Sequence, residues 1–477
     1  MDDQQRHGLT PTLPRLRALP SLRRTSRLNR RWTLAGGALA LVALLSSVVS
    51  QIDLSRLGHP PNAGATATSG GSGAIGNRWE YNPAAGNSTA AMLVGRHEAD
   101  ITATAENDLQ KMTLDEKLGQ MFLIETYYQT WTPDIANMVV GMHAGAIIIY
   151  AKNMQSPSQL RSYIASIQAH ASNPLLVTMD EEGGLVDRLG YNGFFPPLPA
   201  AEWLGSTGKP ALATAAGVQA AQEMRAMGIN TDLAPVVDVL GPHGSVETTR
   251  LYGSTSAVVS TFAGAYLDAL QNHGIVGTLK HWPGIGNVVL DPHKTLPTIN
   301  DSLAQLEADH YTTFQALLSH DPGMIMVTHV IVQNVDPTMP ATLSPKMVDG
   351  VLRGKLGYNG VVMTDSLYMQ GIALRYNLPE AGVLAVIAGD DLLEGAFDTS
   401  SMTDMIAALK AAIASGRITL ARIDQSVLRI LRLKIRFGLL PLRPPRYADL
   451  GATPTPAPSA PDAPPVDIRQ RVLAPVR

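Results

Sequence analysis

The chain of 477 residues contains no cysteine. Disulfide bonds, thiol catalysis and thiolate metal sites are therefore excluded, and a chain of this kind can fold outside the cytosol without oxidation. An excess of positive charge is also missing, because the formal net charge is −3. We therefore expect no nucleic-acid partner. Hydrophobic residues make up 45% of the chain, which is enough for a large buried core.

The N-terminal region differs most in composition from the rest of the chain. A cluster of arginines between residues 15 and 31 precedes a charge-free stretch at residues 32–52. A stretch of this length can cross a bilayer as a helix, and the basic flank places the leading end in the cytoplasm. We predict a basic cytoplasmic segment at residues 1–31 and a transmembrane signal-anchor helix at 32–52. A cleavable signal peptide is the alternative, with Val48 and Ser50 before the cut.

In both cases the remainder of the chain is expected to be extracytoplasmic, either membrane-anchored or secreted. Residues 53–97 include a glycine- and serine-rich run that is typical of a flexible linker. Residues 441–477 are rich in proline and alanine, which predicts a disordered tail. One folded domain is therefore predicted at residues 98–440.

Short apolar runs alternate with helical patterns inside this domain. Most runs show no polar alternation, as is typical of strands buried on both faces. Between them, Thr113 with Glu116 forms a capping box, and Ser156-Pro157 is typical of a helix start. Eight such alternations predict a (β/α)8 TIM barrel, with a doubly wound open sheet as the alternative. The predicted strands are 120–124, 146–150, 175–179, 231–236, 276–279, 324–328, 360–364 and 391–394.

In a barrel of this kind, catalytic side chains lie at the C-terminal ends of the strands. Several predicted strands end in polar residues, which makes them candidates. These are Asp180, Glu181 and Glu182 after the third strand, Asp238 near the fourth, Lys280 and His281 after the fifth, His329 after the sixth and Asp365 after the seventh.

The third strand ends in three consecutive carboxylates, followed by Gly183 and Gly184. The glycines permit a tight turn or a close approach to a ligand. Arg188 follows and is placed to neutralise part of the negative charge. A solvated acidic turn is the structural alternative.

The loop after the fifth strand contains Asp291-Pro292-His293. This spacing allows the carboxylate to contact one imidazole nitrogen and leaves the other free. A carboxylate partner fixes the tautomer and favours the protonated ring, so the imidazole can hold and release a proton near neutral pH. A surface histidine with no function is the alternative.

The seventh strand ends in a single carboxylate, Asp365, which a barrel would direct into its pocket. Retaining glycosidases need a carboxylate nucleophile on one face of the sugar and a proton donor near the leaving oxygen. Asp365 and His293 follow strands seven and five and could flank a sugar ring in this way.

Taken in order, residues 180–188, 280–293, 340–344 and 360–371 resemble the bacterial β-N-acetylhexosaminidases of glycoside hydrolase family 3. The resemblance covers about residues 105–437. It implies a TIM barrel, retention of configuration and no metal or other cofactor. It also implies that Asp365 is the nucleophile and that His293, paired with Asp291, is the acid/base. The resemblance further implies that the sugar is held by Asp180, Arg188, Arg250, Lys280 and His281.

Three positions depart from the family pattern: Ile285 replaces a usual histidine, Leu185 an arginine and Ser366 a second aspartate. β-Glucosidases of the family draw their acid/base from a second domain, and the sequence after Pro441 is too short and proline-rich to form one. The expected partner is therefore a glycan that contains N-acetylglucosamine, from the cell envelope or from chitin-type oligomers, and a monomer is expected. A phosphorylase and a catalytically inactive glycan-binding protein remain the alternative functions.

Overall fold

The computed structural model describes residues 89–242, 244, 245 and 247–443. The predicted cytoplasmic segment (1–31), signal-anchor helix (32–52), most of the linker and the tail beyond residue 443 lie outside these residues. Helix α2 (Thr89–Leu109) begins ahead of residue 98, so helical structure starts within the segment predicted as linker. Among the residues described, no helix has the length and apolar character needed to cross a bilayer.

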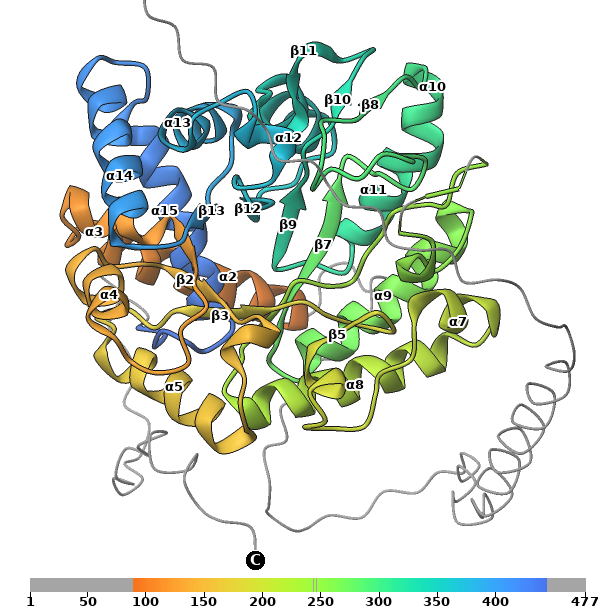
Figure 1. Ribbon diagram of the computed structural model, residues 1–477, viewed down its shortest axis with the longest axis horizontal. Helices are drawn as coiled ribbons and strands as arrows, with labels where there is room; N and C mark the ends of the chain where they lie inside the picture. The colour runs from red at the N-terminus through yellow and green to blue at the C-terminus, as the bar shows by residue number, and fades with distance from the viewer. Residues whose placement is uncertain (1–88, 243, 246, 444–477) are drawn as a thin grey trace, which may run out of the picture. The chain divides into compact units, whose positions relative to one another are not determined.

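Eight parallel strands form a nearly closed barrel (Figure 1). Their order around the barrel follows the sequence, and β1 pairs with both the second and the last strand. The amide of Thr364 at the end of β12 donates to the Leu392 carbonyl just ahead of β13 at 3.0 Å, which joins the two edges. The strands are β1 (Phe122–Glu125), β2 (Ala146–Ile148), β3 (Leu176–Met179), β6 (Thr231–Asp232), β7 (Val276–Trp282), β9 (Met324–Val327), β12 (Val361–Thr364) and β13 (Leu393–Ala396).

Each of the predicted strands overlaps one of these eight, so the predicted barrel is confirmed. The doubly wound sheet is wrong for this chain, because such a sheet reverses its strand order at a switch point and here the order never reverses. Strands β3, β9, β12 and β13 are buried along their whole length. This double-sided burial explains why their sequences lack polar alternation.

Helices follow the strands and cover the barrel (Figure 1). The predicted capping box is present at the start of α3, where Thr113 and Glu116 each accept the other's backbone amide. Ser156 caps α5, with Pro157 in its first turn. The helices are α3 (Leu114–Gln120), α4 (Pro133–Ala136), α5 (Pro157–His170), α6 (Arg188–Tyr191), α7 (Ala201–Ser206), α8 (Pro210–Met227), α9 (Ser256–Asn272), α10 (Leu303–Gln305), α11 (Thr312–Leu318), α12 (Gln370–Ala373), α13 (Leu378–Ala388), α14 (Thr399–Ala414) and α15 (Leu420–Arg436), with π-helical segments at Asn137–Gly141, Leu306–Tyr311 and Lys346–Lys355.

Short strands in the loops form two small sheets after the C-terminal ends of the barrel strands. β4 (Glu181–Gly183) and β5 (Val186–Asp187) pair directly after β3. β8 (Thr298–Ile299), in the loop after β7, pairs with β10 (Ile331–Val332), which pairs with β11 (Asp336–Pro340) (Figure 1). These loops follow the strand ends at which the sequence predicts a site.

Candidate active site

A cavity of about 550 Å³ lies at the C-terminal ends of the barrel strands. Seven of the eight predicted site residues line it, and the eighth, Asp291, contacts His293. The structure therefore brings together side chains that are spread over almost 200 positions of the sequence, from Asp180 to Asp365. The predicted residues on its wall are Asp180, Arg188, Arg250, Lys280, His281, His293 and Asp365.

Asp365 directly follows β12, and two neutral donors fix its carboxylate. Thr328 Oγ1 donates to Oδ2 at 2.9 Å, and the Ser366 amide donates to Oδ1 at 2.8 Å. Burial alone would raise the pKa of this carboxyl, but the imidazoles of His329, His281 and His293 and the Ser366 amide hold it below its ordinary value. Asp365 is therefore an anion at neutral pH, with no cation bonded to it among the described residues.

His293 lies on the loop between β7 and β8 and is 67% exposed. Its Nδ1 is 2.9 Å from Asp291 Oδ1, and its backbone amide donates to the same oxygen at 3.0 Å. Burial raises the pKa of Asp291, but the contacts with His293 together lower it below its ordinary value, so the carboxyl is ionised. The anion fixes the tautomer with the proton on Nδ1 and leaves Nε2 free for a substrate.

Helix α12 holds this loop in place. The Gln370 amide donates to the His293 carbonyl at 3.4 Å. A Cβ atom at Gly371 would lie 3.1 Å from the Pro292 carbonyl oxygen and 3.0 Å from that of Thr295. The missing side chain of Gly371 therefore lets the segment after Asp365 approach the loop that carries the acid/base candidate.

The opposite wall carries a network of buried ion pairs. Lys280 Nζ lies 2.7 Å from Asp180 Oδ1 and 2.6 Å from Glu182 Oε1, and its side chain is only 2% exposed. Burial lowers the pKa of Lys280, but the two carboxylates raise it above its ordinary value. Arg250 donates to both oxygens of Glu182, at 2.6 and 2.8 Å. We call Asp180, Glu182, Arg250 and Lys280 the charged half of the cavity.

His281 is held by carboxylates behind the wall. Its Nδ1 lies 2.7 Å from Asp238 Oδ2, and Arg250 bonds to the nearby Glu247. Burial lowers the pKa of His281, but Glu247 and Asp238 raise it above the ordinary value. Ligand atoms of Asp238, Glu247 and His281 lie within 4.8 Å of one another and could hold a metal ion. However, both carboxylates already have cationic partners from the chain itself.

The three consecutive carboxyl groups after β3 have two different surroundings. Asp180 and Glu182 reach the cavity, whereas Glu181 accepts from the backbone amides of Arg188 and Leu189. Burial and the nearby carboxylates of Asp187 and Asp232 raise the pKa of Glu181 to about 10. The alternative of a solvated acidic turn is wrong, because Glu181 and Glu182 are buried.

The two glycines after this run serve a tight turn. A Cβ atom at Gly183 would lie 2.3 Å from the Pro199 carbonyl oxygen, and one at Gly184 would lie 2.6 Å from the Ala200 Cβ. Both residues also have positive φ angles, of 80° and 59°. Close packing against the following chain, not approach to a ligand, is therefore what these glycines permit.

Two further carboxyl groups in the cavity, Glu125 and Glu394, were not predicted from the sequence. The Tyr150 hydroxyl lies 3.0 Å from Glu125 Oε2 and 3.2 Å from Glu394 Oε1. The single hydroxyl proton of Tyr150 cannot be donated to both carboxyl groups at once. Burial and neighbouring carboxylates raise the pKa of both Glu125 and Glu394. Their positions at the ends of the first and last apolar strands could have identified both residues from the sequence.

The three departures from the family pattern have different surroundings. Ile285 is buried in the core, and Leu185 is 66% exposed and does not line the cavity. Ser366 does line the cavity and donates to Glu125 Oε1 at 2.7 Å. His329 was a further candidate, but its two ring nitrogens contact Thr342 Oγ1 and the Ser366 carbonyl, so it supports the segment after Asp365.

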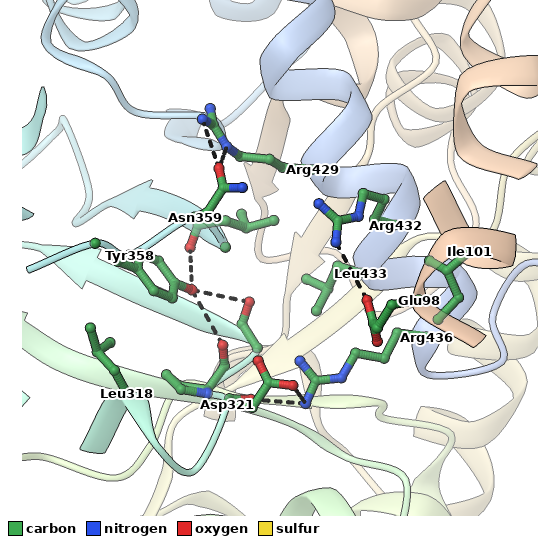
Figure 2. A pocket seen from close by; sticks show the side chains of 15 residues that line it. Glu98, Ile101, Leu318, Asp321, Tyr358, Asn359, Arg429, Arg432, Leu433 and Arg436 are labelled. Carbon is green, nitrogen blue, oxygen red and sulfur yellow. Dashed lines mark hydrogen bonds and ion pairs between the residues drawn. The ribbon is translucent and has the colours of Figure 1, made fainter. Parts of the chain in front are cut away.

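A second cavity lies at the other end of the barrel, where β9 and β12 begin (Figure 2). Arginines of α15 line it, and their partners hold them in place: Asn359 for Arg429, Glu98 for Arg432, and Asp321 for Arg436. None of the predicted site residues lines this cavity. We therefore place the chemistry at the C-terminal end.

The chain is similar to known glycoside hydrolases. Residues 113–433 match the glycosyl hydrolase family 3 N-terminal domain. The chain is 32% identical over 290 residues to a beta-hexosaminidase of Bordetella avium, covering 57% of this chain and 82% of the relative. A beta-N-acetylglucosaminidase/beta-glucosidase of Cellulomonas fimi is 27% identical, and the match covers 71% of this chain but only 60% of that relative.

Among solved structures, a family 3 beta-N-acetylglucosaminidase from Paenibacillus sp. has a similar fold. Its TM-score is 0.66 at 33% sequence identity, and the match covers 76% of this chain and 67% of that one.

Proposed function

Because the chain belongs to glycosyl hydrolase family 3, we propose that it is a retaining hydrolase that releases terminal β-linked N-acetylglucosamine from glycans. The observation that carries this proposal is the pairing of two groups on one cavity. Among the described residues, only neutral donors bond to the ionised Asp365 carboxylate, and none bonds to His293 Nε2, while Asp291 holds the other ring nitrogen. A retaining glycosidase needs such a nucleophile and proton donor.

The reaction then has two steps. In the first, Asp365 attacks the anomeric carbon while His293 Nε2 gives its proton to the leaving oxygen. The products are a glycosyl ester on Asp365 and the free leaving group. In the second step, neutral His293 takes a proton from water, which attacks the anomeric carbon and restores the carboxylate. Asp291 stabilises the imidazolium through its Nδ1 contact, and no step requires a metal or other cofactor.

We further propose that the charged half, with Arg188 and His281, binds the hydroxyl and acetamido groups of the sugar. Ion pairs already orient these side chains, so they lose little further conformational entropy when the sugar binds. Relatives named beta-hexosaminidase and beta-N-acetylglucosaminidase support the choice of sugar. The Cellulomonas fimi name adds beta-glucosidase, which makes the acetamide the feature to test.

A panel of 4-nitrophenyl glycosides tests this proposal. The N-acetylglucosaminide should exceed the glucoside in kcat/KM by about 10²-fold or more, because polar groups that serve the acetamide stay unpaired with glucose. Similar rates on both sugars would rule out the N-acetylglucosaminidase. A sugar 1-phosphate formed only with inorganic phosphate present would indicate a phosphorylase, and no turnover at all would indicate a glycan-binding protein.

We also propose an extracytoplasmic location, on the basis of the arginine-flanked stretch at residues 32–52. The full chain should then fractionate with membranes, and a chain that begins near residue 80 should be soluble and keep its activity. Recovery of the full chain in the soluble cytoplasmic fraction would contradict this location.

A further inference from the structure

The cavity at Asp365 continues into a second hollow of about 560 Å³. Three residues, Glu125, Tyr127 and Tyr368, line both spaces. We call the second hollow the aromatic groove. Its wall includes Tyr127, Tyr128, Tyr368 and Phe397, with the carboxyl groups of Glu125 and Asp398.

The aromatic residues come from three strand ends that lie side by side in the barrel. Tyr127 and Tyr128 follow β1, Tyr368 follows β12 three positions after Asp365, and Phe397 directly follows β13. The charged half, by contrast, comes from the ends of β3 and β7 and from the loop after β6. The nucleophile candidate therefore stands between a charged wall and an aromatic wall.

These rings are more exposed than large aromatic side chains usually are. Tyr127 is 59% exposed, Tyr368 51% and Phe397 36%. The rings of Tyr368 and Phe397 meet edge to face, with centroids 4.4 Å apart. An edge-to-face contact involves the face of only one of the two rings. Clustered apolar surface next to a cavity is a common sign of a binding site.

We propose that the aromatic groove binds the second sugar of the substrate, on the leaving-group side. This inference rests on the hydrolase function proposed above. A pyranose ring has C–H faces that pack on aromatic rings and hydroxyl groups at its edge that can bond to Glu125, Asp398 and the tyrosine hydroxyls. At the charged half, the side chains of Lys280 and Glu182 are only 2% and 4% exposed, so a chain that continues past the broken bond is expected to leave toward the more exposed groove.

The charge of the groove also selects the substrate class. Glu125 and Asp398 line the groove, and Asp404 lines the hollow next to it. Among the residues described, no lysine or arginine lines either hollow, although the Lys152 ammonium lies 4.4 Å from the centre of the Tyr127 ring. Burial raises the pKa of Tyr368, and the nearby carboxyl group of Asp398 raises it further, so this ring lies close to an acidic group.

A leaving sugar that carries a carboxylate would be repelled by this field. The groove therefore favours a neutral leaving sugar, as in chitin-type N-acetylglucosamine oligomers, over one that carries a lactyl ether, as in peptidoglycan fragments.

Two disaccharides and the 4-nitrophenyl N-acetylglucosaminide test this inference. One disaccharide is diacetylchitobiose, and the other differs only by a lactyl carboxylate on the reducing-end sugar. The wild-type protein should prefer diacetylchitobiose by about tenfold or more in kcat/KM, and Asp398→Asn should narrow the preference. Asparagine can keep the helix cap that Asp398 provides to the Ser401 amide at 2.7 Å. A preference for the lactyl disaccharide would overturn the charge argument.

The aromatic contact is tested with Phe397→Ala, which should lower kcat/KM on diacetylchitobiose about tenfold. Phe397→Trp keeps a ring face and should retain most of the rate. Trp203→Ala removes a ring that is 53% exposed and lines neither hollow, and it should change nothing. If Phe397→Ala lowers the melting temperature, Tyr127→Ala serves as the second variant.

Wild-type rates in both Phe397→Ala and Tyr127→Ala, or equal losses in Phe397→Ala and Phe397→Trp, would overturn the subsite. Absence of wild-type turnover on the 4-nitrophenyl substrate would instead contradict the proposed function itself, so the two failures are distinct.

Discussion

Two buried aspartates at opposite ends of the barrel have very different surroundings. Asp365, at the C-terminal end, accepts from a hydroxyl and an amide and faces a cavity. Asp391, ahead of β13 at the N-terminal end, is enclosed by guanidinium groups of Arg353 at 2.7 Å, Arg422 at 3.4 Å and Arg429 at 3.2 Å. A carboxylate neutralised by three cations is fixed in place, whereas one held by neutral donors keeps its charge available for reaction.

Two buried lysines show the same division. Lys280, in the candidate site, is held by two carboxylates, but Lys434 on α15 has Gln120 Oε1 at 2.7 Å as its hydrogen-bond partner. Burial lowers the pKa of Lys434 to about 7. The ion pairs of Lys280 therefore orient side chains of the candidate site, whereas we expect the buried amine of Lys434 to affect stability.

The largest effect is expected for Asp365→Ala. Loss of the nucleophile should lower kcat on aryl N-acetylglucosaminides by about 10⁴-fold or more. The melting temperature should stay close to that of the wild type, because no bonded ion pair is lost. Steady-state kinetics and calorimetry check the two halves of this prediction. Residual turnover above about 1% would point to another nucleophile.

Asp391→Ala should show the opposite pattern. Removing the carboxylate leaves buried guanidinium groups unpaired, which should lower the free energy of unfolding by about 3–5 kcal/mol. The folded protein should keep its kcat at 25 °C. Asp349→Ala is the matched control, because Asp349 is 54% exposed and lies 3.8 Å from the same Arg353. Asp349→Ala should lower the free energy of unfolding by less than about 1 kcal/mol. Denaturant unfolding measures both, and equal losses would contradict the contrast.

His293→Ala should lower kcat/KM on disaccharides by about 10²- to 10⁴-fold. Substrates with activated aryl leaving groups should be affected less in the first step, because they need no protonation. Asp291→Asn should act as a milder change of about tenfold in kcat/KM, because it removes only the anion that orients the ring of His293.

The matched control for this pair is His320→Ala. His320 Nδ1 also lies 2.9 Å from a carboxylate, that of Asp268, but away from the cavity. Wild-type rates in His293→Ala, or equal losses in His320→Ala, would contradict the assignment of the acid/base.

The smallest effect is a gain in stability. Lys434→Met removes a poorly compensated buried amine and should raise the free energy of unfolding at pH 7 by about 1–4 kcal/mol. The size of this effect also depends on pH. Because the folded pKa is about 7, against 10.5 for the exposed amine, the cost is full below pH 7 and vanishes as pH rises toward 10.5. The wild type should therefore gain stability between these values, and Lys434→Met should not. A less stable variant would contradict this account.

Much of the barrel could be predicted from the sequence because its strands are short, apolar and regularly separated by helix starts. The rule that catalytic side chains follow such strands also identified Asp180, Lys280 and Asp365, which line the cavity. Applied to the first and last strands, it would have identified Glu125 and Glu394 as well. The alternation of side chains along a strand would have separated Asp180 and Glu182, which reach the cavity, from Glu181, which does not.

Other features depend on contacts between distant segments and could not be predicted. The position of His293 depends on the approach of Gln370 and Gly371, which are far away in the sequence. The aromatic groove depends on the closure of the barrel, which brings β13 next to β1. Neither of these contacts can be predicted from local sequence, because both form only when the strands close into a barrel.

The proposed mechanism depends most on a covalent bond between Asp365 and the sugar. A 5-fluoro-N-acetylglucosaminyl fluoride tests this directly, because its ring fluorine slows both steps while its good leaving group lets the first proceed. After incubation and proteolysis, mass spectrometry should find the sugar ester on the peptide that contains Asp365, and no label should form in Asp365→Ala. A label on Glu125 or Glu182, or rapid turnover of an active enzyme to a product of inverted configuration, would contradict the account.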